Sequence, residues 1–130
     1  MFVTDTHPIV HYALRKHSKL GQRALQLFRD AEDAKTTIHV PTVVLWEIAD
    51  LINSGIIKLP NRFDHWYREL DGKQGFIVEP LAAQDVNEAR HLPFKDPFDC
   101  LVAGTALRLG YPLITKDRAI TDCGLLETVW

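Results

Sequence analysis

The sequence predicts an α/β domain of three layers, in which a mostly parallel sheet of four or five strands lies between two layers of helices. Short apolar or β-branched segments alternate with longer segments of helical period along all 130 residues, which is typical of a parallel sheet covered by helices. That length suffices for one hydrophobic core and is too short for two. We therefore expect residues 1 to 130 to form a single domain, without repeats or linkers.

The first third of the chain predicts two strands and two helices. Residues 1 to 5 form a short apolar strand, and Pro8 suits the first turn of a helix that continues over residues 9 to 17. Between residues 20 and 33 apolar side chains recur at intervals of three and four, which predicts an amphipathic helix. Residues 36 to 40 are rich in β-branched side chains and predict the second strand.

The remaining elements continue the same alternation. Pro41 begins a helix that runs to Asn53, and Gly55 behind it is the expected stop. The later segments are a short helix at 62 to 70, a strand at 76 to 80, a helix at 82 to 91, a stronger helix at 96 to 109, a strand at 111 to 115 and a fifth strand at 128 to 130.

Composition narrows the class of protein. The 15 Lys and Arg residues against 17 Asp and Glu give a net charge of −2, so any binding to RNA or DNA must come from local patches. Cys100 and Cys123 have no C-x-x-C spacing, which argues against a structural zinc site or a disulfide framework. No apolar run reaches the roughly 18 residues of a membrane span, and Met1 leads into a strand instead of a signal peptide. We expect a reduced, cytoplasmic protein with no membrane association.

Four acidic residues stand where an α/β chain presents side chains to one edge of its sheet. Asp5 ends the first strand, Glu47 interrupts the apolar stripe of a helix, Asp99 lies near the start of another helix, and Asp117 follows a late strand. Ligands of open parallel sheets bind at the carboxyl ends of the strands, where these carboxylates could converge. Such a cluster predicts a site for a hard divalent cation.

Each acid also has a purely structural interpretation. Asp96 is a good N-cap for a helix whose first residue is proline, and Asp99 at the third position favours the helix dipole. Asp5 and Asp117 can each cap a helix or form a turn, and Glu47 can reach water from the edge of its stripe. The joint pattern favours the metal site, because four unrelated local roles would have to coincide at one edge.

The acids occur in four segments, which are VTDTH, WEIADL, DPFDCLVAGTAL and PLITKD. In their order and spacing these segments resemble the PIN-domain ribonucleases, in particular the VapC toxins of type II toxin-antitoxin pairs, over essentially the whole chain. The resemblance implies that the catalytic and metal-binding acids are Asp5, Glu47, Asp99 and Asp117, with Asp96 as an additional metal ligand. It also places hydroxyl residues near the site, which are Thr6 and Thr115. The chain departs from the family pattern at Gly104 and Cys100, which touch helix packing and substrate contact and not the acids.

The resemblance implies an endoribonuclease that depends on Mg²⁺ or Mn²⁺ and hydrolyses RNA phosphodiester bonds to leave a 5′-phosphate. It further implies a homodimer that is silenced by a small antitoxin, whose C-terminal segment covers the acidic cleft. The number of metal ions, the target RNA and the identity of the antitoxin stay open.

Basic residues suggest how an acidic protein could hold RNA. Lys116 and Arg118 flank Asp117, so we expect them to bind substrate phosphates, together with the hydroxyls of Thr6 and Thr115. The basic run from Arg15 to Arg23 is interpreted as a solvated helix face.

The histidines and tryptophans are less informative. The six histidines show no complete zinc-site pattern, and only His7, two residues from Asp5, is of interest. Trp46 and Trp66 are expected in the core or at a dimer interface, because neither lies in a basic aromatic cluster.

Two other classes of α/β protein fit the sequence less well than a nuclease. A phosphotransferase of the haloacid-dehalogenase type would need a second aspartate where His7 stands, and a receiver domain would need an aspartate in HVPTV. A PIN-like module that binds RNA or a protein without nuclease activity stays open as the alternative. Metal-dependent RNA cleavage that is lost on Asp5→Asn or Asp99→Asn would distinguish the two.

Overall fold

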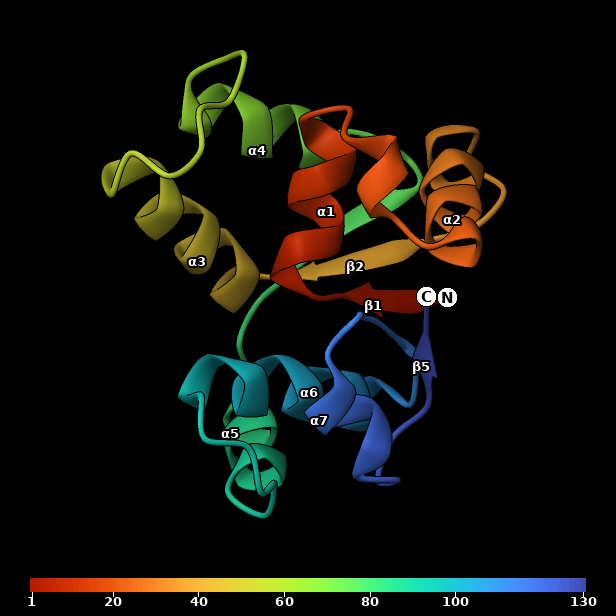
Figure 1. Cartoon of the computed structure of the whole chain (residues 1–130), viewed down its shortest axis with the longest axis vertical. Helices are drawn as coiled ribbons and strands as arrows, with labels where there is room; N and C mark the ends of the chain where they lie inside the picture. Colours follow the sequence, from red (N-terminus) through yellow and green to blue (C-terminus); the bar gives the residue numbers. More distant parts are fainter.

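A five-stranded sheet forms the middle layer of the computed structural model, which describes residues 1 to 130. The strand order is β3-β2-β1-β4-β5 and every neighbouring pair is parallel. The strands are β1 (Phe2–Thr4), β2 (Ile38–Pro41), β3 (Phe76–Glu79), β4 (Leu113–Ile114) and β5 (Thr128–Val129). In Figure 1 helices α1 to α4 lie above β1 and β2 and helices α5 to α7 lie below them. The predicted three-layer α/β fold is confirmed, including the fifth strand.

Seven helices cover the sheet. They are α1 (Thr6–Ala13), α2 (Gln22–Glu32), α3 (Thr42–Asn53), α4 (Phe63–Asp71), α5 (Ala83–Ala89), α6 (Pro97–Leu109) and α7 (Arg118–Asp122), with a 3₁₀ turn η1 (His17–Lys19) after α1. The buried stripe of α2 consists of residues at the predicted spacing, namely Ala24, Leu27, Phe28 and Ala31. No helix in the structure is both long enough and apolar enough to cross a membrane.

The boundaries of α1 differ from the prediction. The helix begins at Thr6, before Pro8, because the Asp5 side chain accepts the Thr6 N–H and serves as the N-cap. Pro8 is tolerated there, since the first N–H groups of a helix have no partner within it. The helix ends at Ala13 instead of residue 17, and Arg15 then turns the chain with a positive φ of 56°.

Helix α7 was missed altogether. It has only five residues, from Arg118 to Asp122, which is too short for a period of 3.6 to be visible in the sequence. Its N-cap is Asp117, whose side chain accepts from the N–H of Ile120. An acid that the sequence placed after a strand therefore also begins a helix.

The chain order reverses at the centre of the sheet. From β1 the chain moves outward to β2 and β3, and it then returns to add β4 and β5 on the other side of β1. The carboxyl ends of β1 and β4 flank this topological switch point, where open α/β sheets commonly hold their ligands. Asp5 follows β1 directly, and Asp117 follows β4 after two intervening residues.

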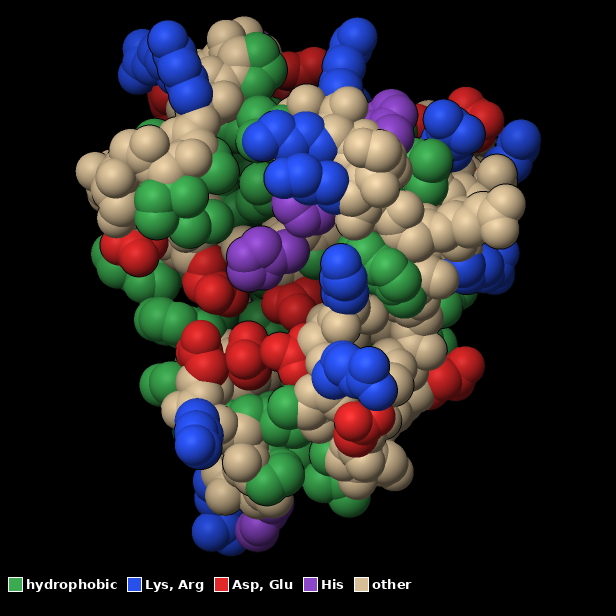
Figure 2. All heavy atoms as spheres, viewed as in Figure 1, with side chains coloured by type: hydrophobic (Ala, Val, Ile, Leu, Met, Phe, Trp, Pro, Cys, Tyr) green, Lys and Arg blue, Asp and Glu red, His purple; other side chains and the backbone are tan.

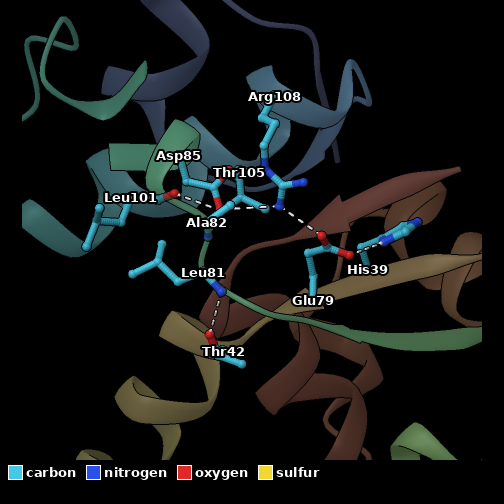
Figure 3. Close-up of polar contacts among 9 residues, drawn as sticks. All are labelled: His39, Thr42, Glu79, Leu81, Ala82, Asp85, Leu101, Thr105 and Arg108. Carbon is cyan, nitrogen blue, oxygen red and sulfur yellow. Dashed lines mark hydrogen bonds and ion pairs between the residues drawn. The ribbon is translucent and has the colours of Figure 1, made fainter. Parts of the chain in front are cut away.

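A buried network of charged side chains joins two strands to two helices (Figure 3). Asp85 is fully buried and accepts hydrogen bonds from Arg108 and from the Thr105 hydroxyl. Arg108 Nη2 also donates to Glu79 Oε1 at 2.8 Å, and Glu79 Oε2 lies 3.1 Å from His39 Nδ1. Burial raises the pKa of Glu79, but the hydrogen bonds from Arg108 and His39 outweigh it, so the pKa lies below its ordinary value.

Helices α5 and α6 approach closely beside this network. The contact occurs at Gly104, where an added Cβ would collide with the backbone carbonyl oxygen of Asp85. Glycine at this position is therefore explained by the close approach of α5.

Trp46 and Trp66 differ in environment. Trp66 packs against the hydrophobic core, which agrees with the prediction. Trp46 on α3 is 56% exposed, so it does not belong to the core, and its assignment to a dimer interface stays a prediction.

Candidate active site

The predicted acids converge on one cleft of about 440 Å³ at the switch point. Its ten lining residues are Asp5, His7, Pro8, His11, Glu47, Asp96, Asp99, Thr115, Lys116 and Asp117. Figure 2 shows acidic side chains gathered at the centre of this face, with histidines directly above them and Lys or Arg side chains beyond. Segments that are far apart in the sequence thus supply five carboxylates to one cleft.

Asp5 lies deepest in the cluster. Its side chain accepts the backbone N–H of Thr6 and the hydroxyl of Thr115, each at 2.8 Å, and only 7% of the residue is exposed. Burial raises the pKa of Asp5, and the negative charge of Asp117 adds to this, although both hydrogen bonds act in the opposite direction. Asp5 is therefore held in a fixed orientation at a site where its negative charge is poorly solvated.

Glu47 reaches the cleft from α3. Its Oε1 accepts the Thr6 hydroxyl at 2.7 Å, and the residue is partly buried. Burial raises the pKa of Glu47, with smaller contributions from the charges of Asp5 and Asp96. The side chain lines the cleft with the other acids instead of extending away from them into water.

Asp99 has a strongly raised pKa. Its pKa is raised to about 7, first by burial and then by the negative charges of Asp5, Asp96, Asp117 and Glu47. The proton is retained near neutral pH because ionisation would add a further negative charge to an already crowded cleft.

Asp96 and Asp117 combine two roles. Asp96 is exposed at the rim and caps α6 by accepting the N–H of Phe98 at 2.8 Å. Asp117 caps α7, and its own N–H donates to the Thr115 hydroxyl at 3.1 Å. The structural interpretation considered for these acids is correct, and it does not exclude a role in the cleft because both residues line it.

The predicted substrate-binding residues lie in different surroundings. Thr6 and Thr115 are almost fully buried and donate their hydroxyls to Glu47 and Asp5, so in this structure they orient carboxylates. Lys116 lines the cleft, and its Nζ lies 6.0 Å from the centroid of the Trp130 ring. Arg118 is exposed and is not among the lining residues. A substrate contact by any of these residues stays a prediction.

Sequence reasoning singled out His7 but overlooked His11. Both lie on α1 and line the cleft, with ring centroids 6.2 Å apart. Their spacing of four residues, with Asp5 just before His7, is the signal that could have placed both on the same face of a helix.

The donor set fits a hard divalent cation. All five acidic side chains offer carboxylate oxygens, which are the ligands that Mg²⁺ and Mn²⁺ prefer. The raised pKa values of Asp5, Glu47 and Asp99 are a second point of fit. Burial raises them first and the neighbouring negative charges add to this, and a bound cation would favour the ionised carboxylates against both effects. As the side chains stand, no three His, Cys, Asp or Glu residues are grouped closely enough to enclose an ion.

Comparison with known proteins agrees with the fold. The family model described as the PIN domain matches residues 2–124. No curated protein matches the chain. A chain from the crystal structure of VapBC2 from Rickettsia felis, bound to a DNA fragment from its promoter, superposes with a TM-score of 0.69 at 16% identity, covering 98% of this chain and 96% of that one.

Two further solved structures are similar over the whole chain. A chain of a toxin-antitoxin complex from Klebsiella pneumoniae has a TM-score of 0.64 at 13% identity. A chain of FitAcB from Neisseria gonorrhoeae has a TM-score of 0.67 at 12% identity. In both cases the match covers 100% of this chain and 97% of the other. At such identities the likeness concerns the fold.

Proposed function

Because the chain belongs to the PIN-domain family, we propose that it is a divalent-metal-dependent endoribonuclease and the toxin of a type II toxin-antitoxin pair. The observation that carries the proposal is the cleft at the switch point, where five carboxylates meet and the pKa of Asp99 is raised to about 7. A fold gains no stability by collecting like charges in a partly buried cleft. The same carboxylates could, however, bind a cation that in turn binds a phosphate.

The metal would be Mg²⁺ or Mn²⁺, held by Asp5, Glu47, Asp99 and Asp117 with Asp96 at the rim. When bound, it would supply Lewis acidity for in-line displacement at phosphorus. The Thr6 and Thr115 hydroxyls keep Glu47 and Asp5 turned into the cleft.

Lys116 gives the cleft a positive charge that can bind an RNA phosphate. We also propose that Arg118 and the hydroxyls of Thr6 and Thr115 contact the substrate. No side chain need act as a covalent nucleophile, because water is the attacking group in hydrolysis.

The proposed partners are a cognate antitoxin and a second copy of the chain. The similar structures named above include toxin-antitoxin complexes, and we propose that the antitoxin's C-terminal segment covers the acidic cleft.

Large apolar side chains are exposed on or beside α3, α5 and α6, and these are Trp46, Leu81, Val86 and Phe98. Exposed apolar side chains on neighbouring elements support a protein interface there. We further propose that the protein acts in the cytoplasm.

The test is cleavage of single-stranded RNA with Mn²⁺ and with EDTA, by wild type, Asp5→Asn and Asp99→Asn. Wild type should cut only with Mn²⁺, and both variants should lose at least about a hundredfold in rate, as for removal of a charge-stabilising group from an active site. Asp50→Asn is the matched control, because Asp50 is exposed on the helix that carries Glu47 and does not line the cleft.

A thermal melt of each variant shows whether it is folded. Mn²⁺ that binds only the folded state should stabilise wild type by about 2.7 kcal/mol at a concentration one hundred times Kd. RNA binding without cleavage at any metal concentration would instead support the alternative, a PIN-like binding module.

A further inference from the structure

Two histidines form one wall of the cleft. His7 and His11 lie one turn apart on α1, with ring centroids 6.2 Å apart and ring planes inclined by 46°. His7 is exposed, while His11 is half-buried and its Nδ1 is buried without a hydrogen-bond partner. The core does not require two polar rings here, and the proposed hydrolysis does not use them.

The surroundings of this wall are positive. The pKa of His11 is lowered, first by burial and then by the charges of His7, Lys19, Lys16 and Lys116. Lys116 closes the same cleft from the chain after β4. Figure 2 shows the order of side chains across this face, which is acidic residues first, then histidines, then Lys and Arg.

We propose that His7 and His11, together with Lys116, bind the phosphate next to the scissile one and so direct the RNA strand over α1. This inference rests on the proposed nuclease function. Asp96 caps α6, which lies across the sheet from α1 (Figure 1), and its carboxylate at the rim repels a polyanion wherever no cation covers it. A strand whose scissile phosphate lies over the acids therefore leaves the cleft along the histidine wall, towards Lys16 and Lys19.

The side chains of His11 and Lys116 contribute differently. A lowered pKa keeps the His11 ring neutral near pH 7, so it donates an N–H to a phosphate oxygen without adding charge. Lys116 supplies a full positive charge, and its contact with the Trp130 ring limits the directions in which it can point. The loss of His11 should therefore weaken RNA binding at every salt concentration, whereas the loss of Lys116 should also flatten the salt dependence.

The experiment measures binding of a short labelled single-stranded RNA in EDTA, where the proposed enzyme cannot cut. His11→Gln and His7→Gln should each weaken binding about tenfold, as expected for a lost hydrogen bond to a charged group. Lys116→Gln should in addition reduce the slope of log K against log salt by about 0.7. His65→Gln is the matched control, because His65 is exposed on α4 and does not line the cleft.

A second series locates the contact on the RNA. One phosphate at a time is replaced by a neutral methylphosphonate, and wild type should lose affinity most at one linkage beside the cleavage point. At that linkage the histidine variants should lose no further affinity, because the partner of the missing side chain is already gone. Melting curves and Mn²⁺ affinity should match wild type in both variants.

Three outcomes would overturn the inference. If His7→Gln and His11→Gln bind RNA as tightly as wild type while wild type cuts RNA, the strand takes another path and the nuclease proposal stands alone. If the variants lose Mn²⁺ affinity, the histidines are metal ligands. If wild type neither binds nor cuts RNA, the nuclease proposal fails and this one fails with it.

Discussion

Arg108 should be among the most important polar residues for stability, although it lies outside the proposed active site. Asp85 has no solvent exposure, and Arg108 supplies its charge partner through Nε and Nη2. Replacing Arg108 by Met keeps the aliphatic bulk and leaves a buried carboxylate with only Thr105 and the Ala82 N–H as donors. Breaking one half of a buried pair costs about 3–5 kcal/mol, and since both neutral donors remain we expect about 3 kcal/mol.

A double variant distinguishes the loss of the charge pair from a simple loss of packing. Asp85→Asn/Arg108→Met removes both charges, so it should be more stable than Arg108→Met alone, with a coupling free energy of about 1–3 kcal/mol.

The assay is urea unfolding followed by circular dichroism at pH 7.5. About 3 kcal/mol is a large part of the 5–15 kcal/mol that stabilises an ordinary domain, so the midpoint should fall clearly. Loss of less than about 1 kcal/mol in Arg108→Met, or strict additivity in the double variant, would refute the interpretation of Asp85 as a buried ion that depends on this pair.

Two further predictions concern the cleft and the packing of α5 on α6. The pKa of Asp99 is raised from 3.8 to about 7, so the folded state binds the proton of Asp99 more tightly than the unfolded chain does. Proton binding therefore stabilises the folded state fully below about pH 4, and this stabilisation is lost as the pH rises through 7. In EDTA, wild type should therefore lose stability between pH 5.5 and 8 relative to Asp99→Asn. The full pKa shift corresponds to about 4 kcal/mol of unfolding free energy. Because this carboxyl is partly solvated, we expect a difference of about 1–2 kcal/mol between the two proteins. Parallel pH profiles of the two proteins would contradict this. Gly104→Ala should destabilise by about 2–3 kcal/mol in denaturant unfolding, because its Cβ meets the Asp85 carbonyl oxygen. Gly72→Ala, whose Cβ would come no closer than 3.4 Å to its neighbours, should change stability by less than about 0.5 kcal/mol, and equal effects at both glycines would refute the steric argument.

The sequence alone determined the alternation of strands and helices, and with it the edge at which the acids meet. Parallel strands all end at one edge, so acids that follow β1 and β4 lie at the same edge of the sheet. That β1 and β4 are neighbours there follows from the strand order of the folded chain. Glu47 could be assigned to the same cluster because a carboxylate within an apolar stripe faces inward on its helix. These inferences rest on periodicity and chain direction, which are local properties that a sequence displays.

Only the tertiary structure decided what depends on distances between remote side chains. His39, Glu79 and Arg108 appear in the sequence as ordinary polar residues on separate elements, and their pairing with Asp85 follows from how α5 and α6 pack beside β2 and β3. The pKa of Asp99 likewise depends on burial and on four neighbouring charges, and of these only Asp96, three residues earlier, is near it because of residue spacing. Electrostatic energy varies with separation and solvent exposure, and the sequence specifies neither until the chain has folded.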